Sequence, residues 1–262
     1  MKKRLILGIL VSLPMMGQVG LGLSPMRLEV GLRPGQAYSG ALELTNELGG
    51  RMRARGELLD FRLDETMTPQ FGRTMESESE WSCRSWLTVN PMETEIETGQ
   101  RLLVRFTIRV PADAAPQSYH CAVGFTAMPR AGEVASTGVR NTVRVVGAFY
   151  VRVGESRGQG MVRSLQMEGE GGARRAVLLV KNDSNCYFRP EGQVEVLDGN
   201  GGVLETLTVP AFPVLPKREQ RFLLPLAPGT AQPAALRVRV DLGLGEIQEA
   251  TVRLAKSGVD GI

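Results

Sequence analysis

His120 is the single histidine among the 262 residues of this chain, so any imidazole chemistry would depend on it. Hydrolases of the Ser-His-Asp or Cys-His type use such a ring as the base that activates a nucleophile. If Tyr119 and Cys121 point into a core, strand alternation places His120 on the opposite, outward face. We therefore expect a surface histidine and no enzyme.

An acidic run offers a second set of reactive groups, because Glu76, Glu78 and Glu80 alternate with serine. Paired carboxylates could serve glycoside hydrolysis or bind calcium. The surrounding stretch, residues 65–80, is polar and contains Pro69 and Gly72. Such a stretch is typical of a mobile surface connection, so we expect solvated carboxylates, no metal site and no cofactor.

Three cysteines, Cys83, Cys121 and Cys186, occur without a C-x-x-C spacing, which argues against a structural zinc site. In an oxidising compartment one pair could close, and Cys83 with Cys121 is the favoured pair, leaving Cys186 over. The alternative is that all three are buried free thiols.

The first residues resemble an export signal. Met1-Lys2-Lys3-Arg4 is basic, a short apolar stretch follows, and Gly20-Leu21-Gly22 supplies small residues for cleavage. We predict a signal peptide over residues 1–22. The alternative, an uncleaved membrane anchor, is disfavoured because the apolar stretch is shorter than the roughly 20 residues that span a bilayer.

Charge excludes one class of partner. Three of the 31 basic residues lie in the predicted signal, which leaves 28 Lys+Arg against 28 Asp+Glu in the rest of the chain. Nucleic-acid-binding domains are normally basic and use aromatic side chains to stack on bases, and aromatic residues make up only 5% here. We predict neither a nucleic-acid partner nor a small-molecule substrate.

Period-two alternation dominates the chain after the predicted signal, and this pattern predicts strands. Residues 101–110 are the clearest case, since Val104, Phe106 and Ile108 share one face while arginines occupy the other. Residues 141–153 are apolar on much of both faces, which indicates a strand covered on both sides or one that offers a face to a partner.

A Gly-rich stretch, residues 154–160, has the composition of a linker, and the strand pattern starts afresh after it. Six further strands are expected over 176–180, 193–197, 203–209, 218–225, 235–242 and 248–254. About 100 residues with six or seven short strands match one sandwich. We predict an all-β chain with an N-terminal immunoglobulin-like domain over residues 23–153 and a C-terminal one over 161–262.

The order of these segments resembles the PapD-like periplasmic pilus chaperones. The matching segments are residues 23–28, 33–46, 86–91, 97–113, 118–121 and 148–150. Tyr119, two residues before Cys121, also has the spacing of a tyrosine corner. The resemblance implies two PapD-like sandwiches in tandem.

In that family two basic residues in the cleft between the domains hold the terminal carboxylate of a pilin subunit. Arg27 matches the first of them, on the first strand. The second position falls on Gly147 in this chain, with Arg144 nearby. The resemblance therefore implies carboxylate binding by Arg27, assisted by Arg144.

The family's last first-domain strand completes the subunit's fold by β-augmentation. In this chain the donor side chains would be Val146, Ala148 and Tyr150. The resemblance predicts a periplasmic chaperone-like protein for secreted pilin-like or envelope subunits, without a membrane anchor after cleavage. The alternative is a structural or adhesive envelope protein, displayed at the cell surface, in which the sandwiches are spacers.

Overall fold

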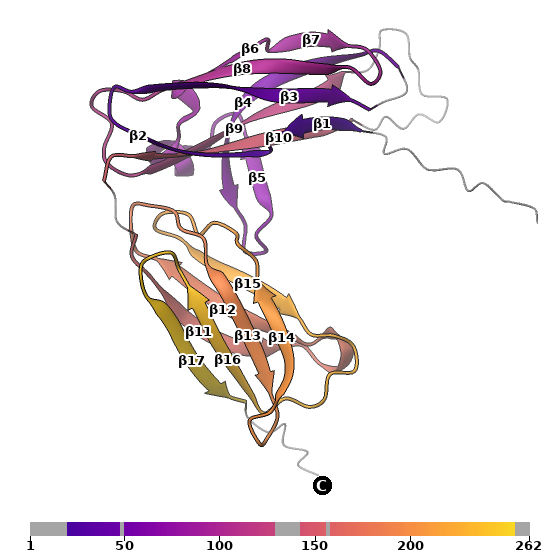
Figure 1. Cartoon of the computed structure of the whole chain (residues 1–262), viewed down its shortest axis with the longest axis vertical. Helices are drawn as coiled ribbons and strands as arrows, with labels where there is room; N and C mark the ends of the chain where they lie inside the picture. The colour runs from indigo at the N-terminus through magenta and orange to yellow at the C-terminus, as the bar shows by residue number, and fades with distance from the viewer. Residues whose placement is uncertain (1–19, 48–49, 129–141, 156–157, 255–262) are drawn as a thin grey trace, which may run out of the picture.

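The computed structural model describes residues 20–47, 50–128, 142–155 and 158–254. These residues form two β-sandwiches arranged in an L (Figure 1), with three short 3₁₀ helices besides the strands. The prediction of an all-β chain with two immunoglobulin-like sandwiches in tandem is confirmed. Among the described residues no helix has the length and hydrophobicity to cross a membrane.

The first sandwich contains two sheets with strand orders β1-β3-β8-β6 and β2-β10-β9-β4-β5, and β7 pairs with β4. Its elements are β1 (Leu21–Ser24), β2 (Arg27–Leu32), β3 (Ala37–Asn46), β4 (Met52–Leu63), β5 (Pro69–Gly72), η1 (Glu76–Trp81), η2 (Arg84–Trp86), β6 (Leu87–Asn90), β7 (Glu93–Ile96), β8 (Arg101–Arg109), β9 (Ser118–Met128) and β10 (Arg144–Val153).

The second sandwich contains sheets β11-β12-β15 and β14-β13-β16-β17. Its elements are β11 (Gly160–Glu168), η3 (Gly171–Ala173), β12 (Arg175–Asn182), β13 (Glu191–Leu197), β14 (Val203–Val209), β15 (Glu219–Pro225), β16 (Ala235–Asp241) and β17 (Ile247–Arg253). Every strand pairing of the described residues stays within β1–β10 or within β11–β17. Residues 154–159 of the predicted linker come between the two sets, whereas its last residue, Gly160, begins β11, a strand that the sequence pattern missed.

Alternation determines which side chains form the first core. Val104, Phe106 and Ile108 of β8 are at most 2% exposed, as the sequence predicted. Gly40 on β3 faces Phe106, and a Cβ atom there would lie 2.7 Å from the phenyl ring. Because the buried Phe106 ring occupies the space that a side chain at position 40 would need, any larger residue there would have to displace the ring.

The chain enters the first sandwich earlier than the sequence predicted. Residues 1–19 of the predicted signal lie outside the described residues. Leu21, however, is 5% exposed and pairs with Asn46 in the ladder between β1 and β3. Cleavage after Gly22 would remove half of β1, so the predicted boundary at residue 22 conflicts with the fold, and any cleavage that preserves β1 must precede Leu21.

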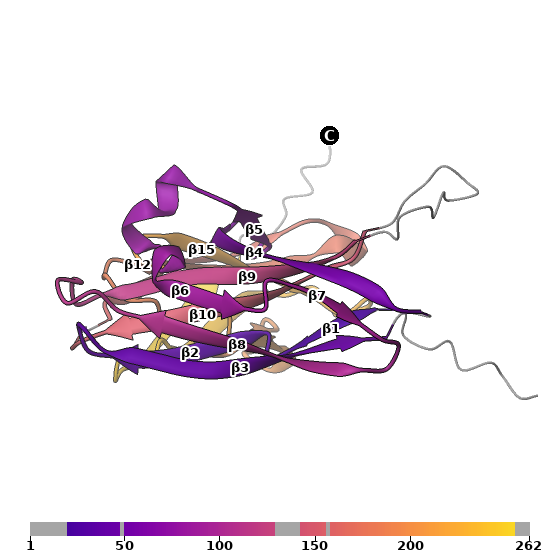
Figure 2. The same cartoon turned by 90° about the horizontal axis from the view of Figure 1, so that it is seen from above.

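Two further expectations are wrong in part: His120 does not lie at the surface, and Glu78 is not solvated, although Glu76 and Glu80 in the same run are exposed. His120 is 2% exposed, and Glu78 within η1 is 1% exposed. His120 does lie on the face opposite Tyr119 and Cys121, but η1 covers that face. Figure 2 shows the helical segment set beside β4 and β9 at one side of the sandwich.

A disulfide and a side-chain hydrogen bond hold β9 in place. A disulfide joins Cys83 to Cys121, with a Cα–Cα distance of 5.2 Å, and Cys186 is a buried free thiol. The hydroxyl of Tyr119 donates a hydrogen bond of 3.2 Å to the carbonyl oxygen of Ala115. This bond is the tyrosine corner that the spacing indicated.

The two domains share an apolar contact. Leu59, Phe61 and Tyr150 of the first domain cluster with Tyr187 and Leu215 of the second. The apolar outer face of β10 is therefore covered by the second sandwich along part of its length. Between β4 and β5, Met67 at the tip of the hairpin packs against the second core, so the hairpin bridges the domains (Figure 1).

Candidate functional site

One edge of β10 has a stretch without a neighbouring strand. β10 pairs with β9 from Arg144 to Arg152, but on its other side β2 begins only opposite Ala148. The chain upstream, β1, pairs with β3 in the other sheet. Within the described residues, the stretch Arg144–Gly147 therefore has a strand on one side only.

Two hydrogen bonds give the orientation of the backbone along this stretch. The N–H of Ala127 on β9 donates to the carbonyl oxygen of Val143, and the N–H of Ala148 donates to the carbonyl oxygen of Met26. Because successive residues of a strand point their backbone groups to opposite sides, the N–H and C=O of Val146 point away from β9. They face the open edge, where an incoming strand could pair with them.

A hollow of about 440 Å³ lies beside this edge, between the two domains. Its lining includes three arginines set among apolar and aromatic side chains. The lining residues are Met26, Arg27, Pro69, Phe71, Arg144, Val145, Val146, Ala148, Tyr150, Arg189, Ala211, Phe212 and Pro213. A segment pairing with β10 would thus have a basic, partly apolar cleft at its side.

Each of the three arginines contacts a carboxylate. Arg27 Nε lies 3.3 Å from Glu29 Oε1, and its side chain is 57% exposed. Arg144 Nη2 lies 3.0 Å from Glu57 Oε2. Arg189, from the second domain, places Nε 2.8 Å from Glu29 Oε1, and its side chain is only 13% exposed. Glu29 therefore receives two guanidinium groups, one from each domain.

Aromatic rings support Arg189. Its guanidinium carbon lies 4.9 Å from the centre of the Tyr150 ring and 5.9 Å from that of Tyr187. The Tyr187 hydroxyl donates a hydrogen bond of 2.9 Å to Glu29 Oε2. Burial, together with the negative charge of Glu29, raises the pKa of Tyr187, so this phenol stays protonated and remains a donor at neutral pH.

The structure brings Arg27, Arg144, Val146, Ala148 and Tyr150, the residues named from the sequence, to one cleft. It also shortens the part of β10 that could pair with an incoming strand. Ala148 and Tyr150 already pair with Arg27 and Glu29 of β2, and Tyr150 is 5% exposed. Of the three expected donor positions, only Val146 lies on the open edge.

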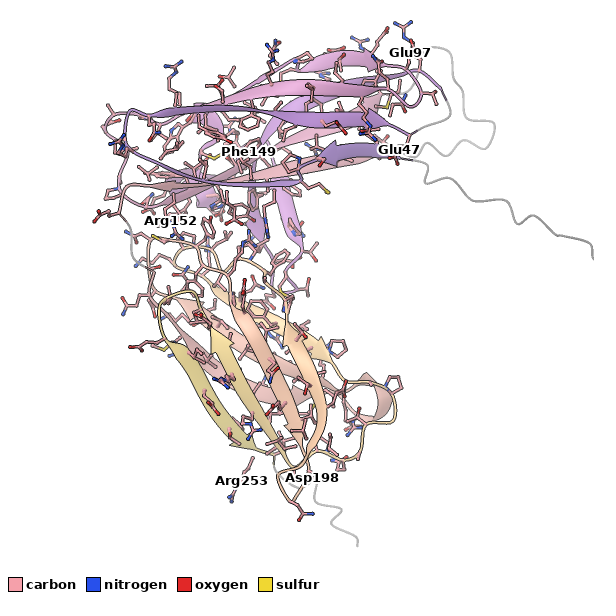
Figure 3. The ribbon with its side chains drawn as sticks, in the orientation of Figure 1. Glu47, Glu97, Phe149, Arg152, Asp198 and Arg253 are labelled. Carbon is pink, nitrogen blue, oxygen red and sulfur yellow. A yellow bond between two sulfur atoms is a disulfide. The ribbon has the colours of Figure 1, made fainter. Side chains whose placement is uncertain are left out.

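Sequence analysis missed Glu29, Tyr187 and Arg189. Glu29 lies two residues after Arg27 on the same strand, and Tyr187 and Arg189 lie in the loop before β13. A loop has no hydrophobic period, so the pattern analysis could not single out these residues. Two aromatic residues and an arginine within 187–189 were nevertheless a signal of a contact site, because the chain has few aromatic residues. Figure 3 shows Phe149 between the sheets of the first sandwich and Arg152 on the side of the second domain.

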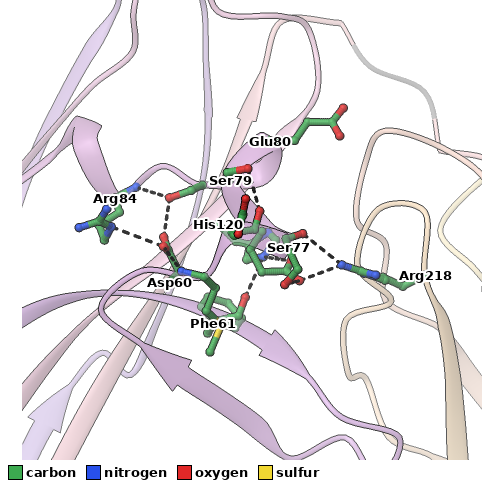
Figure 4. Close-up of polar contacts among 12 residues, drawn as sticks. Asp60, Phe61, Ser77, Ser79, Glu80, Arg84, His120 and Arg218 are labelled. Atoms are coloured by element: carbon green, nitrogen blue, oxygen red, sulfur yellow. Dashed lines mark hydrogen bonds and ion pairs between the residues drawn. The ribbon is translucent and has the colours of Figure 1, made fainter.

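A second polar contact between the domains lies at η1 (Figure 4). Glu78 Oε1 lies 2.8 Å from Nη2 of Arg218, a second-domain residue, and Glu78 Oε2 lies 3.5 Å from His120 Nε2. His120 Nε2 also lies 3.0 Å from the carbonyl oxygen of Phe61. This cluster has no access to the hollow, because none of its residues lines it. We interpret it as structural.

The Glu78 cluster predicts a pH dependence of stability. Burial favours the neutral acid, but the hydrogen bond with His120 and the charge of Arg218 outweigh burial and hold the pKa of Glu78 below its ordinary value of 4.5. A lowered native pKa contributes stability above about pH 5 that is lost as the pH falls through the native pKa. We expect Glu78→Gln to lower stability at pH 7 and to flatten its decline below about pH 5.

Urea unfolding of Glu78→Gln across this pH range measures the effect. The matched control is Glu76→Gln, an exposed carboxylate of the same helix. Parallel stability curves for the wild type and both variants would contradict the assignment of a buried, ionised Glu78.

Other chemistry finds little support. The described residues contain no group of three or more His, Cys, Asp or Glu side chains that could hold a metal ion. Gly154-Glu155-Ser156-Arg157-Gly158 has the spacing of a hydrolase nucleophile motif. That motif requires a strand followed by a helix, whereas here β10 is followed by β11, and Ser156 lies outside the described residues.

Comparisons with known proteins give structural similarity only. No family model matches the chain. No curated protein matches it either. The E. coli chaperone DraB is similar in structure, with a TM-score of 0.46 and 14% identity over 90% of this chain and 98% of that one.

Two other solved structures are similar to the same extent. The class 5 fimbriae chaperone CfaA has a TM-score of 0.47 and 10% identity, covering 90% of this chain and 100% of that one. A structure of Salmonella enterica SafA pilin in complex with the SafB chaperone has a TM-score of 0.45 and 15% identity, covering 90% and 96%. At such identity the similarity concerns the arrangement of the chain, and function must be inferred from the cleft itself.

Proposed function

We propose that this protein is an exported, chaperone-like binding protein that holds an extended segment of a secreted pilin-like or envelope subunit along β10. The proposed compartment is the periplasm, because the predicted signal directs export and one disulfide is formed. The protein acts by binding, without catalysis.

The open edge of β10 carries the proposal. Unpaired backbone groups at a sheet edge invite pairing with another chain, and proteins normally cover such edges or break them with charges and bulges. Here Val146 lines a hollow together with Phe71, Phe212 and other apolar groups, so the hollow lies beside the open edge. An incoming strand would gain main-chain hydrogen bonds from β10 and a place for one row of its side chains.

The charge of the cleft indicates which end of a client it receives. Arg27 lies where β2 begins, which is the point at which the open edge stops. A strand pairing with Arg144–Gly147 would therefore end beside the Arg27 guanidinium. A terminal carboxylate placed there could accept two parallel hydrogen bonds.

The alternative, a spacer or adhesive protein that hands nothing on, makes a different structural demand. A sandwich that serves only as a spacer gains nothing from an unpaired edge and is expected to shorten or cover it. The open stretch at Val146 favours the client-binding protein over the spacer.

Site-specific cross-linking in cells tests the proposal. We expect a photoreactive side chain at Val146 to capture a small secreted β-rich subunit, identified by mass spectrometry. The matched position is Thr107, which lies on the outer face of β8, away from the cleft. Adding Arg27→Ala should reduce the yield about tenfold through loss of a charge-assisted hydrogen bond. Equal products at 146 and 107, or none at 146, would exclude client binding at this edge.

A further inference from the structure

Arg189 is held in the cleft on several sides. Besides its bond to Glu29, its Nη1 lies 3.2 Å from the carbonyl oxygen of Ala211, and its plane covers the Tyr150 ring. Its Nη2 is buried and has no hydrogen-bond partner among the described residues. A buried donor without an acceptor costs free energy, so a rigidly placed guanidinium with a spare donor indicates a site built for more than its present partner.

Arg27 also has unused donor capacity. Its Nε lies 3.3 Å from Glu29 Oε1, while more than half of its side chain is exposed to solvent. Two guanidinium groups carry two positive charges, and Glu29 supplies one negative charge. The group Arg27, Arg189 and Glu29 therefore keeps a net charge of about +1, which attracts a second anion.

Glu29 is well placed to act as a substitute for such an anion. It presents a carboxylate between the two arginines, accepts a hydrogen bond from Tyr187 and is 35% exposed, so solvent reaches it. It lies on β2, which a β10-paired segment would approach end-on. Its carboxylate has the same chemistry as the terminus of a peptide.

We propose that Glu29 is an internal ligand of the pair Arg27 and Arg189, and that the terminal carboxylate of a bound segment takes its place. Arg189, which belongs to the second domain, supplies the second cation of the cleft. The corresponding position in the first domain is Gly147, which has no side chain that could bind a carboxylate. Glu29 keeps both guanidinium groups ordered in the free protein and lowers the affinity for carboxylates until a client strand pairs with β10. This inference rests on the proposed function and deepens it.

Calorimetric titration with two synthetic peptides tests it. Both peptides are about ten residues long, with alternating apolar and polar side chains, one ending in a free carboxylate and the other in an amide. Both report strand pairing, whereas only their difference reports the carboxylate site. We expect the free carboxylate to bind about tenfold more tightly to the wild type.

The variants separate the two arginines and the glutamate. Arg189→Gln should abolish the preference for the carboxylate. Glu29→Gln should widen it about tenfold, because the amide oxygen still accepts hydrogen bonds while the competing charge is gone. Arg152→Gln is the control. Arg152 donates a hydrogen bond of 3.3 Å to the carbonyl oxygen of Tyr187 but does not line the hollow. The substitution therefore removes the same positive charge from outside the hollow.

The outcomes distinguish this inference from the function on which it rests. If both peptides bind equally to all variants, strand pairing stands and the internal-ligand role is wrong. If neither peptide binds, the proposed function fails as well. A misfolded Arg189→Gln protein cannot imitate support, because the Glu29→Gln variant must gain affinity, and thermal unfolding and Arg189→Lys verify that the fold survives at position 189.

Discussion

Val146→Pro is expected to reduce client binding about 100-fold while the protein remains folded. The N–H of Val146 faces the open edge, so a proline there removes a donor that only an incoming strand would use. Its ring also fills space beside the edge that the incoming backbone needs. The proline removes the N–H bond and displaces the donor that would pair with the Val146 C=O, so two main-chain hydrogen bonds, each worth about 0.5–1.5 kcal/mol, account for an effect of this size.

Folding should tolerate the substitution because proline is compatible with an edge strand whose N–H faces outward. The ladder to β9 uses Val143, Val145 and Gly147 by the same alternation, and these residues keep their donors. Binding is measured by calorimetry with a client peptide, and stability by urea unfolding, which should change by less than about 1 kcal/mol.

The matched variant Val146→Thr keeps the N–H and the branched shape, and it should bind like the wild type. If proline and threonine variants bind equally well, the client does not pair with this edge. In that case the hollow would have to receive its partner through side chains alone.

The sequence predicted the faces of β10 but not its edges. Alternation correctly assigned Val145, Phe149 and Val151 to one face, because side-chain direction depends only on position along a strand. Whether a strand has neighbours depends on segments far away in the chain. Here the open stretch exists because β1 and β2 belong to different sheets, and residues 25–26 carry the chain from one to the other.

His120 shows the same limit of sequence analysis: alternation gives the direction of a side chain but not its burial. The predicted direction of its side chain was right, and the predicted exposure was wrong, because η1 and the second domain cover that face of β9. A polar run such as 76–80 is read as solvated when its neighbours are unknown. Glu78 could be buried only because His120 and Arg218, distant in sequence, supply its partners.

The cation from the second domain could not have been predicted by aligning strands. Arg189 lies in a loop, and its position depends on the orientation of the two sandwiches, which the Met67 hairpin and the Tyr150–Tyr187 contact fix. A resemblance carried over strand by strand placed the second cation in the first domain, near Arg144. Tertiary contact between the domains placed another candidate, Arg189, against Glu29, the same carboxylate that Arg27 contacts.

The double variant Cys83→Ala/Cys121→Ala is expected to lose about 4 kcal/mol of unfolding free energy, the value for a closed loop of this length. The disulfide spans 38 residues and connects the segment after η1 to β9. Without it, the unfolded chain gains conformational freedom, whereas the native contacts are otherwise kept. Removing both cysteines avoids leaving a reactive thiol inside the core.

A local consequence should accompany the global one. Cys83 lies two residues after the end of η1, so the disulfide also holds Glu78 against His120 and thereby supports its pair with Arg218. Hydrogen exchange should therefore rise in η1 and at His120 in the double variant before the strands of the core open.

Cys186→Ala is the control for the double variant, because Cys186 is buried but forms no disulfide. Its loss should cost less, through a small cavity alone, and a reducing agent should still destabilise this control protein. A double variant within about 1 kcal/mol of the wild type would mean that apolar packing, rather than the cross-link, holds η1 on β9. The covered face of His120 would then depend on packing such as that of Phe61, whose ring centre lies 4.9 Å from that of His120.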